Sequence, residues 1–278
     1  MQDQFQAQSS SGARGGIKVG VVTHAAAEIV TNVGIAVILF AAGRAYPWIR
    51  SWARYWRAKR FWRPIVTSRP TVVIGKHEAD WEASDLIGIG DAKALDELRM
   101  HFRTLHLPSD FPARFVDEVS SGVTLDENYL CIGGPDTSPG GQGLIADLWR
   151  RSQTSYEWGR SAEGWAGIYD GGSGKWFETK GSAGDLTDDY ALIVRMRNPY
   201  CQPGANRWAL LFAGCSGFGT WGALRFSTTS EFVKNHLVAS DDAFECLVSV
   251  EVANRAPGKV SLLDVRTLEQ QPQPAGPV

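Results

Sequence analysis

Three glycines lie within six residues at the end of an apolar run. Gly214, Gly217 and Gly219 form the pattern G-x-x-G-x-G between the run 207–214 and the helix-forming segment 220–226. Glycine lets a ligand approach the backbone closely, and the amides at a helix N-terminus bind phosphates and carboxylates. The pattern therefore predicts a loop for an anionic ligand, with contacts from Gly214, Ser216, Gly217, Gly219 and Thr220.

A tight turn packed against a neighbouring strand explains the same glycines. Their order differs from the G-x-G-x-x-G of dinucleotide sites, and no lysine follows them as in a P-loop. The nearest candidate for a ribose-binding acid, Glu251, lies beyond the about 20 residues that the dinucleotide fingerprint requires. The pattern favours an anionic ligand without selecting NAD, and the tight turn stays open as an alternative.

Two further glycine-rich loops follow apolar runs, after residue 74 and after residue 132. Because the carboxyl ends of parallel strands meet at one edge of an open α/β sheet, we expect all three loops to share one pocket. Asp136 and Ser138 are suited to hydrogen-bond a ribose, and helix capping is the alternative role for either residue. The ligand contacts predicted in these two loops are Gly88, Gly90, Asp91, Gly133, Gly134, Asp136 and Ser138.

Carboxylates gather in the first of these loops, where Glu78 and Asp80 lie nearest to the predicted strand 71–75. Such a group of acids is suited to hold Mg²⁺ or to supply a general base for attack on an N-glycosidic carbon. Glu78 and Asp80 are therefore the candidate catalytic residues of a nucleotide-cleaving or NAD-cleaving hydrolase. A solvated acidic loop without a catalytic role is the alternative.

Other nucleophiles receive less support from the spacing. Phe218 occupies the last glycine position of G-x-S-x-G, so a nucleophile elbow is not indicated. Cys215 precedes a predicted helix, where thiolates form readily, and His77 or His236 would be its base. An ordinary buried thiol is the alternative. The four cysteines lie far apart without zinc-ligand spacing, which indicates a reducing compartment.

The order of apolar and amphipathic segments predicts the fold class. Three strand-loop-helix units begin at residues 71, 128 and 207, and they indicate a parallel or mixed sheet with helices on its faces. The segments 164–181 and 243–268 are typical of hairpins that extend the sheet at an edge, the second joined at Ala256-Pro257-Gly258. We expect an α/β fold with a Rossmann-like parallel or mixed sheet and β-hairpin additions.

An apolar segment, residues 19–42, precedes a stretch that holds seven Arg and Lys residues and no acid, residues 44–63. About 20 apolar residues span a bilayer, and cations mark the cytoplasmic end of such a helix. The aromatic residues between Tyr46 and Trp62 are typical of the headgroup layer. We expect a single-pass helix in an inner or plasma membrane, with the C-terminal domain in the cytoplasm.

Three alternatives apply to this N-terminal region. A helix buried in the protein has the same apolar composition as residues 19–42. A cleaved signal peptide is disfavoured, because a dense cationic stretch directly after the apolar segment opposes export. A soluble basic helix in contact with nucleic acid is the alternative for residues 44–63.

The predicted organisation has five parts, which are a disordered tail (1–16), a transmembrane helix (17–43), a basic aromatic juxtamembrane helix (44–64), a Rossmann-like cytoplasmic domain (65–268) and a second disordered tail (269–278). With 28 basic and 30 acidic residues the chain is nearly neutral, so nucleic acid is not an expected partner. The expected partners are the membrane and a small anionic ligand, and a homo-oligomer stays open.

The leading hypothesis is a membrane-anchored cytoplasmic domain that binds a nucleotide or another small anionic ligand, as a sensor or an effector. The second is a nucleotide N-glycosidic or NAD-cleaving hydrolase that uses the acidic loop 78–91. The third is a non-catalytic, membrane-tethered scaffold. The sequence does not identify the cofactor, since a nucleotide, NAD and Mg²⁺ are all compatible with these loops.

Overall fold

A computed structural model describes residues 16–269 apart from 76, 80–81, 87, 116–125, 138–142, 183–184, 203 and 240–241. The predicted tails, 1–16 and 269–278, therefore lie almost wholly outside the described residues. The chain divides into two compact units, Met1–Ala53 and Arg54–Val278. Helix α1 (Gly16–Val66) begins in the first unit and ends in the second.

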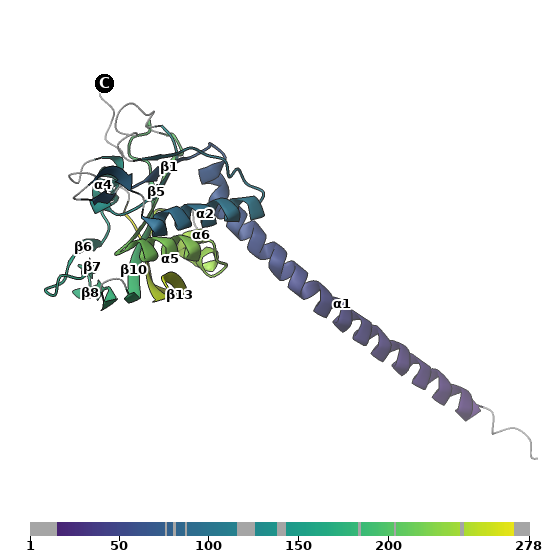
Figure 1. Cartoon of the computed structure of the whole chain (residues 1–278). Coiled ribbons are helices and arrows are strands. Elements are labelled where there is room, and N and C mark those ends of the chain that lie inside the picture. Colours follow the sequence, from purple (N-terminus) through teal and green to yellow (C-terminus); the bar gives the residue numbers. More distant parts are fainter. Residues whose placement is uncertain are drawn as a thin grey trace, which may run out of the picture. The chain divides into compact units, whose positions relative to one another are not determined.

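The second unit is a mixed α/β body (Figure 1). Its helices are the end of α1, α2 (Ile89–Thr104), α4 (Leu144–Ser152), α5 (Gly217–Ser227) and α6 (His236–Ala239), with the 3-10 turns η1 (Pro135–Thr137) and η3 (Phe232–Lys234). The strands of its main sheet are β1 (Thr71–Ile74), β4 (Ala113–Phe115), β5 (Tyr129–Ile132), β9 (Lys180–Ser182), β10 (Asp185–Arg197), β11 (Trp208–Gly214), β12 (Phe244–Ala253) and β13 (Ala256–Thr267).

The main sheet has the order β13-β12-β10-β11-β5-β1-β4, and β9 pairs with β10. Strands β4, β1, β5 and β11 are four neighbouring strands that run parallel to one another. Strand β10 pairs antiparallel with both β11 and β12, and β13 pairs antiparallel with β12. The mixed sheet and the hairpin at its edge, β12–β13, agree with the sequence-based expectation.

The turn of this edge hairpin lies at Asn254 and Arg255, and not at Ala256-Pro257-Gly258 as the sequence suggested. Both turn residues have positive φ, 52° and 59°, as a type I′ turn requires, and this turn suits the twist of paired strands. Pro257 instead lies within β13. An edge strand tolerates proline because one row of its amides has no partner strand.

The two strands of the predicted hairpin 164–181 form outside the main sheet, and only the end of this segment, in β9, pairs with β10. Strand β7 (Ala166–Asp170) pairs with both β6 (Tyr156–Arg160) and β8 (Lys175–Glu178) in a separate three-stranded sheet. Residues 156–160 carry no strand signal among the patterns described above, and as β6 they provide the strand that pairs with β7. Another small sheet, β2 (His77–Ala79) with β3 (Glu82–Leu86), follows β1.

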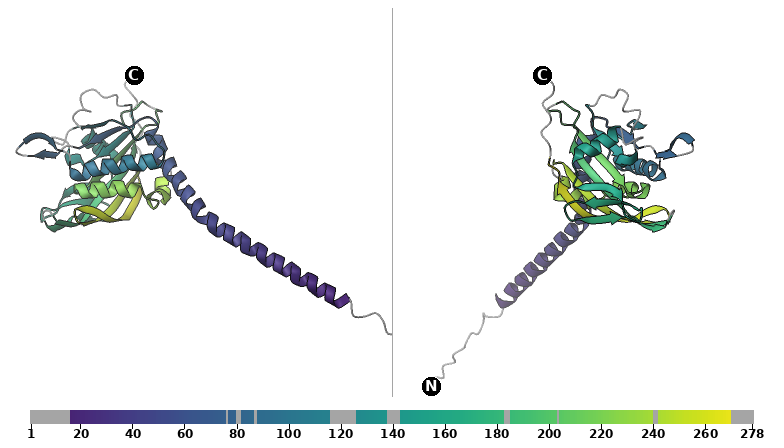
Figure 2. Two further views of the ribbon diagram at one scale, coloured as in Figure 1. Left: turned by 45° about the vertical axis from the view of Figure 1, so that its right-hand side comes forward. Right: turned by 90° about the vertical axis from the view of Figure 1, so that its left-hand side faces the viewer.

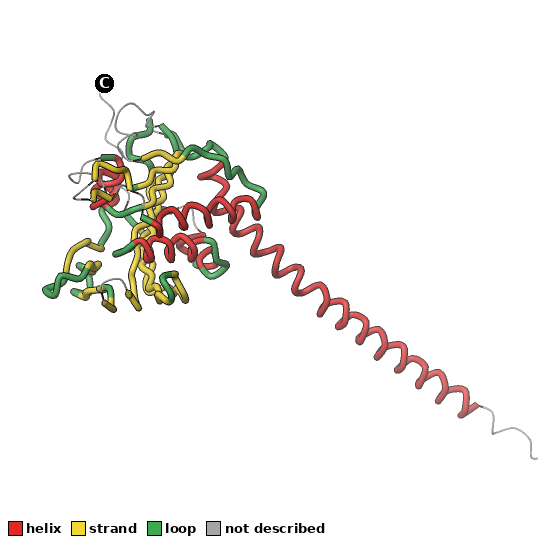
Figure 3. The backbone as a smooth tube through the Cα atoms, viewed as in Figure 1, coloured by secondary structure: helices red, strands yellow, loops and turns green. Residues whose placement is uncertain are grey.

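The two faces of the main sheet carry different helices (Figure 3). One core joins α2, α5 and the end of α1 to residues such as Val72, Leu130 and Phe212. The other core joins α4 to residues of the opposite face, such as Val73 and Leu211. Figure 2 shows α2 and α5 side by side on their face of the sheet.

The last turns of α1 are part of the folded body. Phe61 packs edge-on against Phe232, with 5.2 Å between the ring centres. Trp62 packs in the same way against Phe102, with 5.0 Å between the ring centres. Trp62 is 0% exposed and Phe61 6% exposed. These two side chains are therefore core residues, and their assignment to a lipid headgroup layer is corrected by their burial.

One helix of the described residues is long and apolar enough to span a membrane, and it is α1 in its stretch Thr31–Val66. The apolar side chains Val37, Leu39 and Phe40 are 61–68% exposed in this stretch. Tyr46, Trp48 and other aromatic side chains that follow them are exposed as well. A run of exposed apolar and then aromatic side chains is the composition of a membrane helix and its interface.

Candidate functional site

The candidate site lies at the edge of the sheet that is formed by the carboxyl ends of its parallel strands. Strands β1, β5 and β11 are parallel neighbours, with Ile74 opposite Ile132 and Ile132 opposite Phe212, so the loops that follow them leave the same edge. Helix α2, which follows β1, and helix α4, which follows β5, cover opposite faces. Adjacent strands whose connections leave to opposite faces mark a topological switch point, where open α/β sheets bind ligands.

A buried carboxylate occupies the turn between β11 and α5. Asp189 is 0% exposed, and its Oδ2 accepts hydrogen bonds from the Gly219 amide at 2.6 Å and from the Ser216 hydroxyl. Its Oδ1 accepts from the Tyr190 amide at 2.8 Å. Ser216 caps α5 by accepting from the Phe218 amide at 3.2 Å. The first turn of α5 thus already has an anion and a cap from within the protein.

The strand-helix junction explains Gly214 and Gly219 by packing. A Cβ on Gly214 would lie under 3.0 Å from the Thr220 amide nitrogen, and a Cβ on Gly219 would lie 2.7 Å from Asp189 Oδ2. The Gly214 amide also donates to Thr220 Oγ1 at 2.9 Å. The tight-turn interpretation accounts for both glycines without a ligand, and the ligand contacts assigned to this loop stay a prediction.

The structure brings the start of α2 against the start of α5. A Cβ on Gly90 would lie 2.8 Å from Gly217 Cα and still closer to the Gly217 carbonyl group. Helix α2 has Gly88 as its N-cap, without a side-chain capping hydrogen bond, and Asp91 in its first turn is 1% exposed. Two of the three predicted loops therefore meet at this point.

The third loop lies beside the end of β11. The Gly133 amide donates to the Phe212 carbonyl oxygen at 2.9 Å, and a Cβ on Gly134 would lie 3.8 Å from Ala213 Cβ. Gly133 has φ of 126°, a conformation that glycine adopts readily. Asp136 is exposed on η1, whereas Ser138 lies outside the described residues.

The candidate catalytic acids are only partly placed. Glu78 belongs to β2, but its side chain lies outside the described residues, as does the whole of Asp80. Within the described part of the chain, no three His, Cys, Asp or Glu side chains are grouped so that they could hold a metal ion. The catalytic and Mg²⁺ hypotheses for the acidic loop therefore stay predictions.

Cys215 is not activated as a nucleophile. Burial, followed by the negative charge of Asp189, raises the pKa of the Cys215 thiol well above its ordinary value. A cysteine nucleophile reacts as the thiolate, so this protonated thiol is unsuited to that role at neutral pH. The side chains of its proposed bases, His77 and His236, lie outside the described residues.

Sequence reasoning missed Asp189 as a member of this edge. The residue belongs to β10, and the antiparallel pairing of Ala191 with Gly214 brings it to the glycine turn. Burial raises its pKa to about 6, although the donors from Ser216, Tyr190 and Gly219 act in the opposite direction. One acid within a predicted strand, two residues before Ala191, is not a distinctive signal in the sequence.

The raised pKa of Asp189 predicts how stability depends on pH. Its native pKa of about 6 exceeds the unfolded value of about 4, so the native state binds the proton more tightly. This stabilising contribution is complete below pH 4 and is lost as the pH rises through 6. Relative to an Asp189→Asn variant, the wild type should lose on the order of 2 kcal/mol of unfolding free energy between pH 4 and pH 7.

Urea unfolding of both proteins at a series of pH values measures this difference. The Asn variant removes the titration but keeps the size of the side chain. If the advantage of the wild type grows with pH, the three donors stabilise the ionised carboxylate more than burial opposes it, and the predicted direction is wrong.

Comparison with known proteins assigns no family to the chain. No protein-family model matches the sequence. No curated protein matches it either. Its function has to follow from its residues and their geometry.

Proposed function

We propose that the chain is a membrane-anchored α/β protein whose body binds a nucleotide or another small anionic ligand, as a sensor or an effector. The observation that carries the proposal is the switch point between β1 and β5, where strands end in glycine-rich loops. A Rossmann-like site occupies the same position in open α/β sheets. The close approach of Gly90 to Gly217 further supports a single shared site.

The hydrogen bonds of the two helix starts support a choice between them as the site of the anionic group. The Phe218 and Gly219 amides of α5 already donate to Ser216 and Asp189, so α5 forms a wall of the site and does not cradle the anion. We assign the anionic group to the start of α2 at Gly88, where no side chain of the described residues provides a cap. The exposed Asp136 then accepts a hydrogen bond from a ribose hydroxyl.

The membrane part of the proposal rests on α1. It is long and apolar enough to span a bilayer, and the arginines and lysines of residues 44–63 follow the apolar segment 19–42 in the sequence. Positive charge flanks the cytoplasmic ends of membrane helices. We therefore propose one crossing of an inner or plasma membrane, with the body in the cytoplasm.

A ligand titration with a matched variant tests the site. Full-length protein in neutral detergent should melt at higher temperature with ATP, ADP or NAD, because a ligand that binds the native state stabilises it. Asp136→Ala should weaken binding about tenfold, since a charged hydrogen bond contributes roughly 1.5 kcal/mol or more. Asp96→Ala, which removes an exposed acid from α2, is the control and should bind like the wild type. No thermal shift with any of these compounds, or equal affinities of the two variants, would contradict the proposal.

The hydrolase alternative uses the same edge. The β2–β3 hairpin lies between β1 and α2 in the chain, so Glu78 and Asp80 belong to the loop that leaves β1. Chromatography of the same incubations would detect free nicotinamide or free base. Release that depends on Glu78 would favour the hydrolase, and binding without release would favour a sensor or an effector.

A further inference from the structure

A cationic pocket lies at the opposite edge of the sheet from the glycine-rich loops. Trp208, which lines it, begins β11, whereas Gly214 ends that strand. At about 3.3 Å per residue, the two ends of this strand lie roughly 20 Å apart. The pocket is thus separate from the proposed nucleotide site and does not depend on it.

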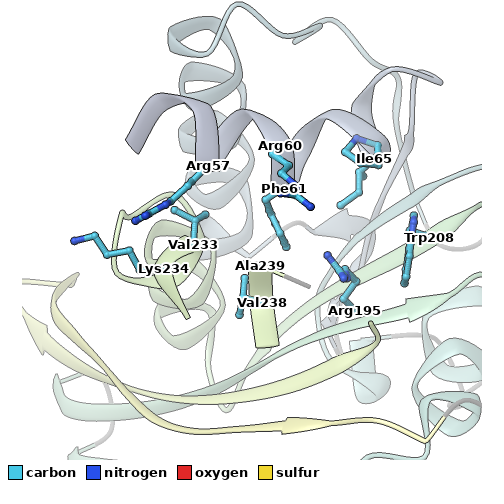
Figure 4. A pocket seen from close by; sticks show the side chains of 11 residues that line it. Arg57, Arg60, Phe61, Ile65, Arg195, Trp208, Val233, Lys234, Val238 and Ala239 are labelled. Carbon is cyan, nitrogen blue, oxygen red and sulfur yellow. The ribbon is translucent and has the colours of Figure 1, made fainter. Parts of the chain in front are cut away.

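The pocket has a volume of about 300 Å³ and lies between the end of α1, the sheet and the segment η3–α6 (Figure 4). Among the described residues that line the pocket, four are cationic and none is acidic. The cations are Arg57 and Arg60 of α1, Arg195 of β10 and Lys234 of η3. Segments far apart in the sequence therefore bring positive charge to one cavity.

Arg195 is a fixed charge in the wall of the pocket. It is 4% exposed, and its Nε and Nη2 donate to the Asp242 carbonyl oxygen at 3.0 and 2.6 Å. Its guanidinium lies 4.6 Å from the ring centre of Trp208 and 5.2 Å from that of Phe244. Contacts on several sides hold the group in place, so its charge is preorganised for a ligand.

The other three cations stand exposed at the pocket. In the part of the chain that the structure describes, no carboxylate forms an ion pair with Arg57, Arg60 or Lys234. A concave surface lined by positive charges raises the local concentration of anions. An anion bound between them would relieve their mutual repulsion and gain charge-assisted hydrogen bonds.

We propose that this pocket binds a phosphate group that carries a short organic substituent. Guanidinium groups match phosphate oxygens in charge and geometry, and three of the four cations are arginines. The apolar lining residues, which include Phe61, Ile65 and Val238, would contact the substituent. The volume is at the lower limit of small-molecule pockets, so the part of the ligand that enters the pocket is no larger than a phosphate with a short organic group.

Such a phosphate has two sources, an anionic phospholipid headgroup and a soluble phosphate ester. Calorimetric titration of the full-length protein in neutral detergent separates them, with dihexanoyl phosphatidic acid, glycerol 3-phosphate and dihexanoyl phosphatidylcholine as probes. Tighter binding of phosphatidic acid than of glycerol 3-phosphate assigns the lipid, and the reverse order assigns the soluble ester. Phosphatidylcholine should bind at least tenfold more weakly than the preferred probe. No binding of the two anionic probes overturns the proposal.

Two double variants with the same change of charge test the pocket itself. Arg57→Glu with Lys234→Glu changes two pocket cations, and Lys93→Glu with Lys259→Glu changes two exposed lysines elsewhere. We expect at least a tenfold loss of affinity for the preferred probe in the first variant and less than a twofold loss in the second. Equal losses, or no loss in either variant, would overturn the proposal.

Unchanged melting temperatures would show that both double variants are folded. Asp136→Ala should leave this phosphate affinity unaltered, because Asp136 lies at the other edge of the sheet. The phosphate pocket and the nucleotide site can therefore fail independently of each other.

Discussion

A chain that begins at Arg54 is expected to fold, whereas a chain that begins at Pro64 is not. The two chains differ by residues 54–63, which form part of α1 and contribute Ala58, Phe61 and Trp62 to the core. The compact body begins at Arg54. Removal of this segment takes two large aromatic side chains out of contact with Phe102 and Phe232.

The size of the effect follows from burial. Truncation of one buried Phe or Trp to alanine costs about 3–5 kcal/mol, so the loss of both costs about 6–10 kcal/mol. The whole unfolding free energy of a domain is about 5–15 kcal/mol. The chain from Pro64 should therefore be expressed as an insoluble protein or show no cooperative melting transition.

Circular dichroism and size-exclusion chromatography of the two chains measure this outcome. In the full-length protein, Trp62→Ala should destabilise by about 3–5 kcal/mol, and Trp48→Ala, which changes a 69% exposed side chain, by less than about 0.5 kcal/mol. A cooperative transition for the chain from Pro64 would show that the end of α1 is dispensable.

The same chains test the membrane anchor. The full-length protein should sediment with membranes, and the chain from Arg54 should stay in the soluble fraction after gentle lysis. Recovery of the full-length protein in the soluble fraction would contradict the proposed single crossing.

Residue patterns were sufficient to predict the mixed α/β fold, because apolar runs followed by amphipathic segments are local signals. The burial of Phe61 and Trp62 depends on tertiary contacts instead. Both lie among arginines, as aromatic residues of a membrane interface also do. Only their packing against Phe102 and Phe232 distinguishes a core residue from an interfacial one.

The glycine turn shows a similar limit for the candidate site. A ligand cradle and a close helix packing both require glycine, so spacing alone does not separate them. Asp189 separates the two explanations, because it belongs to another strand and accepts a hydrogen bond from the Gly219 amide. Its position follows from the pairing of β10 with β11, which is a long-range property of the fold.

The contact between Gly90 and Gly217 makes a second prediction with a large effect. Gly90→Ala should lower the unfolding free energy by about 3 kcal/mol or more, at the upper end of the range for overpacking. A methyl group on Gly90 would lie 2.8 Å from Gly217 Cα and closer to its carbonyl group. Backbone atoms cannot rotate away as a side chain does, so α2 and α5 would have to separate.

Gly217→Ala is the matched control from the other side of the same contact. Its Cβ would lie 3.4 Å from Gly90 Cα, an ordinary van der Waals distance, and Gly217 has no positive φ. Both glycines lie in the first turn of a helix, so the propensity gain of up to about 1 kcal/mol applies to each substitution. Gly217→Ala should therefore change stability by less than about 1 kcal/mol.

Urea unfolding of the two variants tests this asymmetry, and equal stabilities would show that the helices adjust to a methyl group at either position. Because Gly217→Ala is expected to fold like the wild type, it also separates packing from ligand binding at the glycine turn. Its methyl group adds bulk to the first turn of α5 and leaves the hydrogen bonds of Asp189 in place. Full nucleotide affinity of this variant would remove Gly217 from the ligand contacts and leave the start of α2 as the anion site, whereas a loss of affinity without a loss of stability would return the anion to α5.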